Sequence, residues 1–161
     1  MKLTVTVLLV AVFLYSFNAC QNSKKTGKSA TDLTFETIQR GVLKGAGEEG
    51  FAQEVIKVTS SQELKEVLKG INSVNKEIDL DFIGNRDFFD EYMLLFVFDK
   101  ARGTGGYKLK VNEVKAAKKE ITLKVYIKTP GEIAPSVMTQ PYEVIQLEKS
   151  EKLINASFIE Q

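Results

Sequence analysis

The sequence predicts a mainly β domain of the α+β class, a twisted antiparallel sheet or β-sandwich with one packed helix. Two segments, 107–112 and 121–128, alternate apolar and polar residues with the period of half-buried strands. A third segment, Tyr92–Phe98, is apolar on both faces, which indicates a strand in the middle of a sheet. Helical spacing of apolar residues is clear in one place, after Ser60.

Composition excludes several kinds of site. The chain has 161 residues and suits one domain after processing. It contains no histidine, and Cys20 is its only cysteine, so histidine-based catalysis, a thiolate zinc site and an internal disulfide are excluded. Lys2 is the only charged residue before Cys20, so 21 basic and 21 acidic side chains follow it. This balance gives no reason to expect a nucleic-acid partner.

Residues 1–19 have the pattern of an export signal. Lys2 precedes an apolar run from Leu3 to Phe17, and small Ala19 stands before Cys20. A cysteine at this place is typical of bacterial lipoproteins, in which it receives diacylglycerol. We therefore expect Cys20 to anchor the protein to a membrane, in the periplasm or at the cell surface. The alternative is a plain secretory signal followed by an incidental free cysteine. Residues 20–32 are polar and predict a flexible tether.

The folded domain is predicted to span residues 33–161. Thr34–Ile38 and Phe51–Val58 are its first two strand candidates, and the glycine-rich segment Gly41–Gly50 between them is a predicted loop. Ser60 and Glu63 fit a capping box. A short amphipathic helix follows, which ends near Gly70 and has on one face Leu64, Val67, Leu68 and Ile71.

Asp79–Asp90 has two possible interpretations. Its acids and Gly84 partly match the spacing of a calcium-binding loop. However, Ile83 stands where a ligand belongs, and the apolar neighbours are typical of a core. We therefore favour a short strand with outward acids, followed by a turn.

The second half of the chain predicts strands joined by two distinctive loops. After Tyr92–Phe98 come a glycine-rich loop, the alternating pair and a proline-containing loop at 129–135. Glu143–Leu147 is the next strand, with Pro141 at its entry because proline lacks the N–H that a ladder needs. Residues 152–159 predict a last edge strand.

The loop from Arg102 to Tyr107 is the best candidate for function. Three of its residues are glycines, where a hairpin needs one or two, and this allows another backbone to approach closely. A glycine-rich turn with no binding role explains the same residues equally well. No catalytic constellation is evident, and the acids between Asp79 and Glu91 carry little information, so we expect a non-enzymatic protein.

Gly105-Gly106-Tyr107, the strand pair after it, the proline-containing loop and the segment Gln140–Ile145 together resemble the PrcB C-terminal domain family. The resemblance covers about residues 78–148. It implies a small β-rich extracytoplasmic domain that assists or binds a protease. Thr104–Tyr107 also has a weaker similarity to the chagasin-type inhibitors of cysteine proteases.

We therefore expect a lipid-anchored extracytoplasmic protein-binding module, an accessory subunit that assists or stabilises a protease. The alternatives are a stand-alone protease inhibitor and a small-ligand or calcium-binding domain. No cofactor, metal or nucleic acid is expected. The predicted partner-binding residues are Arg102, Gly103, Thr104, Gly105, Gly106, Tyr107, Pro141 and Tyr142.

Overall fold

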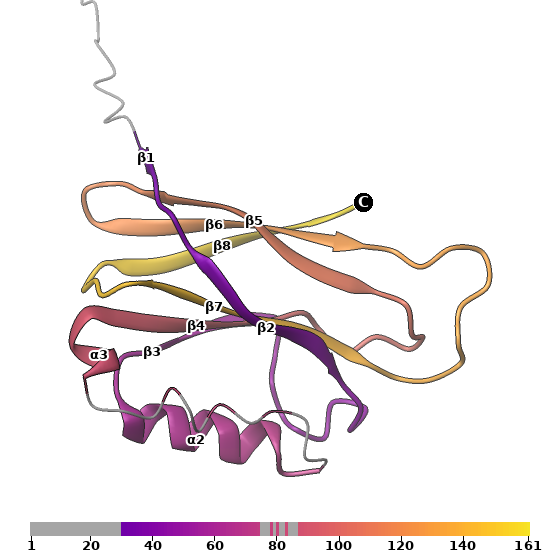
Figure 1. The fold of residues 1–161 in the computed structure, drawn as a ribbon. Helices are drawn as coiled ribbons and strands as arrows, with labels where there is room; N and C mark the ends of the chain where they lie inside the picture. Colours follow the sequence, from indigo (N-terminus) through magenta and orange to yellow (C-terminus); the bar gives the residue numbers. More distant parts are fainter. Residues whose placement is uncertain (1–29, 75–77, 79, 81–82, 84–86) are drawn as a thin grey trace, which may run out of the picture.

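Two four-stranded sheets face each other in the computed structural model, which describes residues 30–74, 78, 80, 83 and 87–161 (Figure 1). The open sheet has the order β1-β5-β6-β8 and comprises β1 (Thr31–Asp32), β5 (Lys108–Ala116), β6 (Glu120–Lys128) and β8 (Leu153–Glu160). The covered sheet has the order β2-β7-β4-β3 and comprises β2 (Glu36–Leu43), β7 (Gln140–Glu148), β4 (Tyr92–Phe98) and β3 (Glu54–Val58). The predicted fold class, mainly β with one packed helix, is confirmed.

Helix α2 (Ser61–Ile71) lies across the outer face of the covered sheet (Figure 1). It begins where predicted, because Ser60 Oγ accepts a hydrogen bond of 3.2 Å from the Glu63 N–H. The Glu63 carboxylate reaches back and accepts a bond of 2.6 Å from the Thr59 N–H. Leu64 and Ile71 are buried in the layer between helix and sheet.

Strand β4 is the centre of the molecule, as its apolar sequence predicts. It pairs with β7 on one side and β3 on the other. Its side chains alternate between two core clusters. Those facing α2 are Leu94, Phe96 and Phe98. Those facing the open sheet are Met93, Leu95 and Val97.

The open sheet supplies the other half of the core between the sheets. Alternate residues of β6, from Ile121 to Ile127, are buried. In β5, buried Val111 is followed by buried Val114, because a bulge between Val111 and Glu113 shifts the alternation by one residue.

Three features differ from the sequence-based prediction. Strand β2 continues through Gly41 to Leu43, so the predicted Gly41–Gly50 loop starts only at Lys44. Gly41 pairs with Tyr142 in the ladder, and glycine suits this position because a Cβ there would lie 2.8 Å from the Tyr142 hydroxyl oxygen. Thr31 and Asp32, expected in the tether, form β1 against the end of β5.

The third difference is the direction of the last strand. The sheets were expected to be antiparallel, but β8 runs parallel to β6. The reason is the route of the chain: β7 lies in the covered sheet, and the chain crosses to the open sheet before β8 begins. The prediction that β8 is an edge strand is confirmed.

Half of the Asp79–Asp90 segment lies outside the described residues, including Asp79 and Asp81. Of its described members, Leu80 and Ile83 are buried in the cluster beneath α2. The short helix α3 (Phe88–Glu91) leads directly into β4, with Phe89 buried. The described apolar members Leu80, Ile83 and Phe89 therefore serve the core, as the favoured interpretation predicts. The strand and outward acids of that interpretation are not tested, because Asp79, Asp81 and Phe82 lie outside the described residues, and the end of the segment is helical.

Candidate functional site

Two loops lie together at one end of the sandwich, opposite the β5–β6 turn (Figure 1). The glycine loop comprises residues 99–107 and the proline loop residues 129–139. Arg102 and Thr139 form an isolated antiparallel bridge, with N–H to O distances of 2.8 and 3.1 Å. The Gly105 N–H donates to the Pro135 carbonyl oxygen at 2.9 Å. The two predicted loops are therefore one unit, held by backbone hydrogen bonds between segments far apart in sequence.

Arg102 lies at the base of this unit and is buried, with 6% of its surface exposed. Its guanidinium donates two hydrogen bonds to the Asp99 carboxylate, at 2.7 and 3.0 Å, and one to Glu160 Oε1 at 2.8 Å. The guanidinium also lies over the ring of Tyr107, 4.4 Å from its centroid. Arg102 therefore joins the glycine loop to the end of β8 and does not present its charge to solvent.

The electrostatics of this cluster favour the charged forms. Burial opposes the charge on Arg102, but hydrogen bonds with Asp99 and Glu160 outweigh it and raise the pKa of Arg102. The hydrogen bond from Arg102 lowers the pKa of Glu160. Asp99 is fully buried and also accepts a 2.7 Å bond from the Gln53 side-chain amide. Such a bidentate, buried ion pair fixes the geometry of the loop base.

Gln140, the first residue of β7, also holds the base of the glycine loop. It is fully buried, and its Nε2 donates to the carbonyl oxygens of Asp99 at 2.7 Å and Phe51 at 2.8 Å. The Asp99 N–H in turn donates to the Pro141 carbonyl oxygen at 2.9 Å. The first residues of β7 thus hold the start of the glycine loop.

The glycines serve the contact between the two loops. A Cβ on Gly105 would lie 3.1 Å from Val137 Cγ1, and one on Gly106 would lie 3.0 Å from Pro130 Cβ. Gly106 also has a φ of +89°, a conformation that favours glycine. Gly103 faces open space. The close backbone approach expected of this loop therefore occurs within the protein, toward the proline loop.

The predicted site residues occupy different environments. Gly103 and Gly106 are exposed, while Thr104 and Tyr107 are partly buried. Pro141 is buried, and Tyr142 is 3% exposed and packs beneath α2, where its ring lies 6.5 Å from that of Phe98. Tyr142, predicted to bind a partner, therefore lies in the core and does not present its ring at the surface. Partner binding by the exposed residues stays a prediction.

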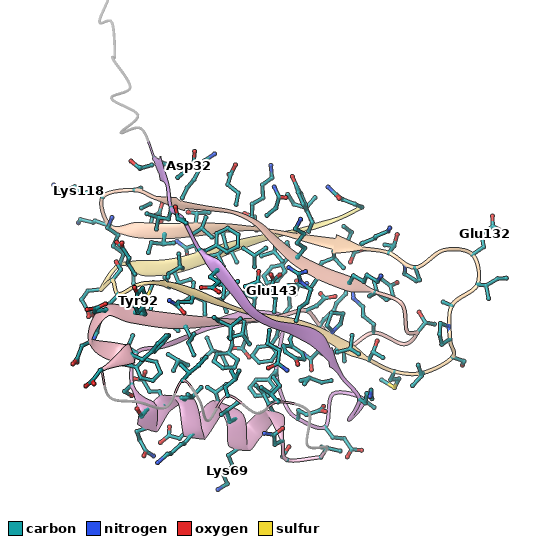
Figure 2. The ribbon with its side chains drawn as sticks, in the orientation of Figure 1. Asp32, Lys69, Tyr92, Lys118, Glu132 and Glu143 are labelled. Atoms are coloured by element: carbon teal, nitrogen blue, oxygen red, sulfur yellow. The ribbon has the colours of Figure 1, made fainter. Side chains whose placement is uncertain are left out.

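Three exposed apolar side chains of the proline loop were not predicted. Ile133 is 96% exposed, and Val137 and Met138 are each about half exposed. Glu132 marks the far tip of the loop in Figure 2. The sequence contained a signal for these exposed residues: Ile133 and the Val137-Met138 pair are apolar but stand among turn-forming residues. A loop has no buried face, so burial in a core does not explain apolar residues there.

Glu143 is a second buried acid that the sequence analysis missed. It is fully buried between the sheets and accepts hydrogen bonds from the side chains of Thr37 and Arg40. Its other oxygen accepts a 2.7 Å bond from the Val111 N–H on β5. Glu143 therefore joins the two sheets through the β5 bulge, which is a structural role.

Within the described residues, no group of three or more acidic, cysteine or histidine side chains is placed to hold a metal ion. The same part of the chain has no helix that is long and apolar enough to span a membrane.

Comparison with known proteins gives a family match for part of the chain. Residues 93–148 match the family described as PrcB C-terminal. The matched region runs from β4 to the end of β7 and includes both loops. The predicted family resemblance is confirmed, and the match indicates an accessory type of domain associated with a protease complex. No curated protein and no solved structure matches the chain.

Proposed function

We propose that this chain is a lipid-anchored extracytoplasmic binding module that serves as an accessory subunit of a protease complex. The glycine loop and the proline loop form its contact surface. The observation that carries the proposal is the exposure of Ile133, Val137 and Met138 on the proline loop, which is hydrogen-bonded to a glycine loop with a buried ion pair at its base.

Exposed apolar side chains on rigid loops suit protein binding. A side chain such as Ile133 can fill a pocket on a partner and supply an energetic hot spot. The loops are already ordered by their mutual hydrogen bonds and by Arg102, so binding costs less conformational entropy than it would for a free loop. The family match supports a protease complex as the source of the partner.

The position of the N-terminal end of the domain supports the anchored arrangement. Asp32 in β1 and Glu132 in the proline loop lie at opposite ends of the sandwich in Figure 2. A lipid on Cys20, joined to β1 by the intervening residues, would leave the two loops at the end of the domain away from the attachment point. Both loops would then be accessible to a partner in the periplasm or at the cell surface.

The surface is tested by crosslinking and pull-down of the full chain from native membranes. Ile133→Asp should reduce recovery of the crosslinked partner about tenfold or more, since a charge would be placed in an apolar contact. Val74→Asp is the matched control, because Val74 is also an exposed apolar residue but lies just beyond α2. Equal recovery with Ile133→Asp and wild-type protein would refute the assigned surface.

The role of the bound complex is tested by protease activity. An accessory subunit should raise the activity or the thermal stability of the recovered protease, and Ile133→Asp should lose that effect. Inhibition by the wild-type chain would instead identify the alternative, an inhibitor whose exposed loop occupies a protease cleft.

The anchor is tested separately. Cys20→Ser should release the protein from the membrane fraction while leaving the sandwich folded, because the described members of both core clusters begin at Leu33. Unchanged membrane fractionation and processing of Cys20→Ser would refute lipidation at this cysteine.

A further inference from the structure

Strand β8 forms an edge of the open sheet with few of the features that usually protect edges, and its only charged residue is Glu160 at its end. It has eight residues, contains no proline or lysine, and keeps an unbroken register with β6 from Leu153 to Glu160. Natural edge strands are commonly short, bulged or rich in charge, because their open backbone groups pair with other strands. The other three edges fit this rule: β1 has two residues, β3 has five, and β2 has a register shift between Thr37 and Gln39.

The hydrogen-bond pattern shows which backbone groups of β8 face outward. The N–H groups of Leu153 and Gln161 donate toward β6, to Lys119 at 3.1 Å and Ile127 at 2.9 Å. In a parallel ladder, alternate residues direct both backbone groups to the neighbouring strand. The odd-numbered residues of β8 therefore bond β6, and the N–H and C=O groups of Ile154, Ala156, Phe158 and Glu160 point to the free edge.

The side chains of β8 are also incompletely covered. Leu153 is 71% exposed and Ile159 is 36% exposed, both on the outer face of the open sheet. Ile154, Ala156 and Phe158 face the core but are only partly buried. Strand β3 of the covered sheet lies close to β8, but among the described residues no backbone ladder joins the two strands. The edge is therefore open in both its backbone and its side chains.

We infer that β8 pairs antiparallel with β8 of a second copy of this chain, around a twofold axis at Ala156. This register places Lys152 opposite Glu160, Leu153 opposite Ile159, Ile154 opposite Phe158 and Asn155 opposite Ser157. Every pair is complementary: opposite charges, apolar with apolar, and polar with polar. Ala156 meets itself, and its small side chain avoids a clash at the axis.

The register also satisfies the backbone. Antiparallel pairing requires residues with outward N–H and C=O groups to stand opposite each other. Around Ala156, even-numbered residues face even-numbered residues, and these are the ones whose backbone groups are free. A shift of two residues in one direction places Lys152 opposite Phe158, and a shift in the other direction places Ile154 opposite Glu160. The complementarity is lost in both cases. The resulting sheet has eight strands across the two copies.

One strand pair is a small interface. It is below the size of a standard stable complex, so we expect a weak dimer with a Kd on the order of 10–100 μM. We infer a second copy of this chain as the partner of the β8 edge because β8 is complementary to itself in this register. No other chain has to be assumed.

The affinity is tested on the full chain in detergent micelles by light scattering and sedimentation over a concentration series. Wild-type protein should shift to the mass of a dimer. Ala156→Pro should weaken the dimer about tenfold or more, because it removes the outward N–H groups at the axis without removing a bond to β6. Ala156→Ser is the control that keeps these N–H groups, and circular dichroism verifies folding. Wild-type protein that stays monomeric, or an Ala156→Pro protein that dimerises as well as wild type, overturns the proposal.

The register is tested by disulfide formation in a Cys20→Ser background, where the introduced thiol is the sole one. Asn155→Cys and Ser157→Cys proteins, mixed and oxidised, should crosslink several times more than either alone. The paired Cα atoms would be about 4.5 Å apart in the mixture, within disulfide range, and roughly 7–8 Å apart in a dimer of one variant. Thr122→Cys on interior strand β6 is the control. Equal crosslinking of the mixture and the single variants overturns the register.

Discussion

Removal of the Arg102 guanidinium is the sharpest test of how the loop base is held. Arg102→Met keeps most of the apolar stem but removes the two bonds to Asp99, at 2.7 and 3.0 Å. Asp99 is fully buried, and its carboxylate would keep one described partner, the Gln53 amide at 2.7 Å. Leaving one member of a buried pair uncompensated costs about 3–5 kcal/mol.

This magnitude is large compared with the stability of a small domain, which is typically about 5–15 kcal/mol. The free energy of unfolding, measured in urea, should fall by about 3–5 kcal/mol, and the melting temperature by roughly 10–20 °C. Arg102→Lys should fall between wild type and Arg102→Met, since an ammonium keeps the charge but cannot make the bidentate pair.

The double variant separates the cost of an unpaired charge from the value of the pair itself. Asp99→Asn combined with Arg102→Met leaves no buried charge, so it should be more stable than Arg102→Met alone. The reasoning fails if Arg102→Met lies within about 1 kcal/mol of wild type. It also fails if the double variant is no more stable than the single one.

Three further predictions concern the glycine loop, the buried glutamate and the end of β8. Gly106→Ala should destabilise the protein by about 1–2 kcal/mol in urea unfolding, because its φ of +89° is unfavourable for a residue with a Cβ. Gly103→Ala, which faces open space, should have little effect. Glu143→Ala should cost at least about 1–3 kcal/mol, because the buried β5 N–H that it binds loses its acceptor; faster exchange of that amide in NMR would verify the cause. Glu160 should titrate below its unfolded pKa, so its stabilising effect is present above that value and is lost as pH falls through the folded pKa. An NMR titration in which Arg102→Met leaves the Glu160 midpoint unchanged would contradict this.

Local patterns predicted the strands because each strand buries one face or two. The apolar run of β4 and the alternation of β6 are direct consequences of their burial, and both were predicted within a residue or two. The helix start was predictable because Ser60 and Glu63 act within one turn. The pairing of strands within a sheet was not predictable in the same way. The parallel direction of β8 depends on where the chain crosses, and no residue of β8 carries that information.

The candidate site was predicted only in part for a related reason. The extra glycines of the glycine loop indicated a close approach correctly, but the approaching segment is the proline loop rather than a partner. Arg102 was expected to be a contact residue, and it is buried because Asp99, three residues earlier, receives its guanidinium. Exposed Ile133 was missed because apolar spacing identifies buried faces, and a single apolar residue in a loop has no period.

The two proposed surfaces share one ion pair, and this has a physical consequence. Arg102 belongs to the glycine loop, while Glu160 is the last residue of β8, and their side chains lie 2.8 Å apart. In the inferred dimer, Glu160 also stands opposite Lys152 of the second copy. A change in the position of Glu160 therefore alters the support of Arg102, and with it the base on which Ile133 is presented. Partner binding and strand pairing need not be independent, because linkage between sites requires only a shared element whose arrangement both affect. The Arg102–Glu160 pair is such an element.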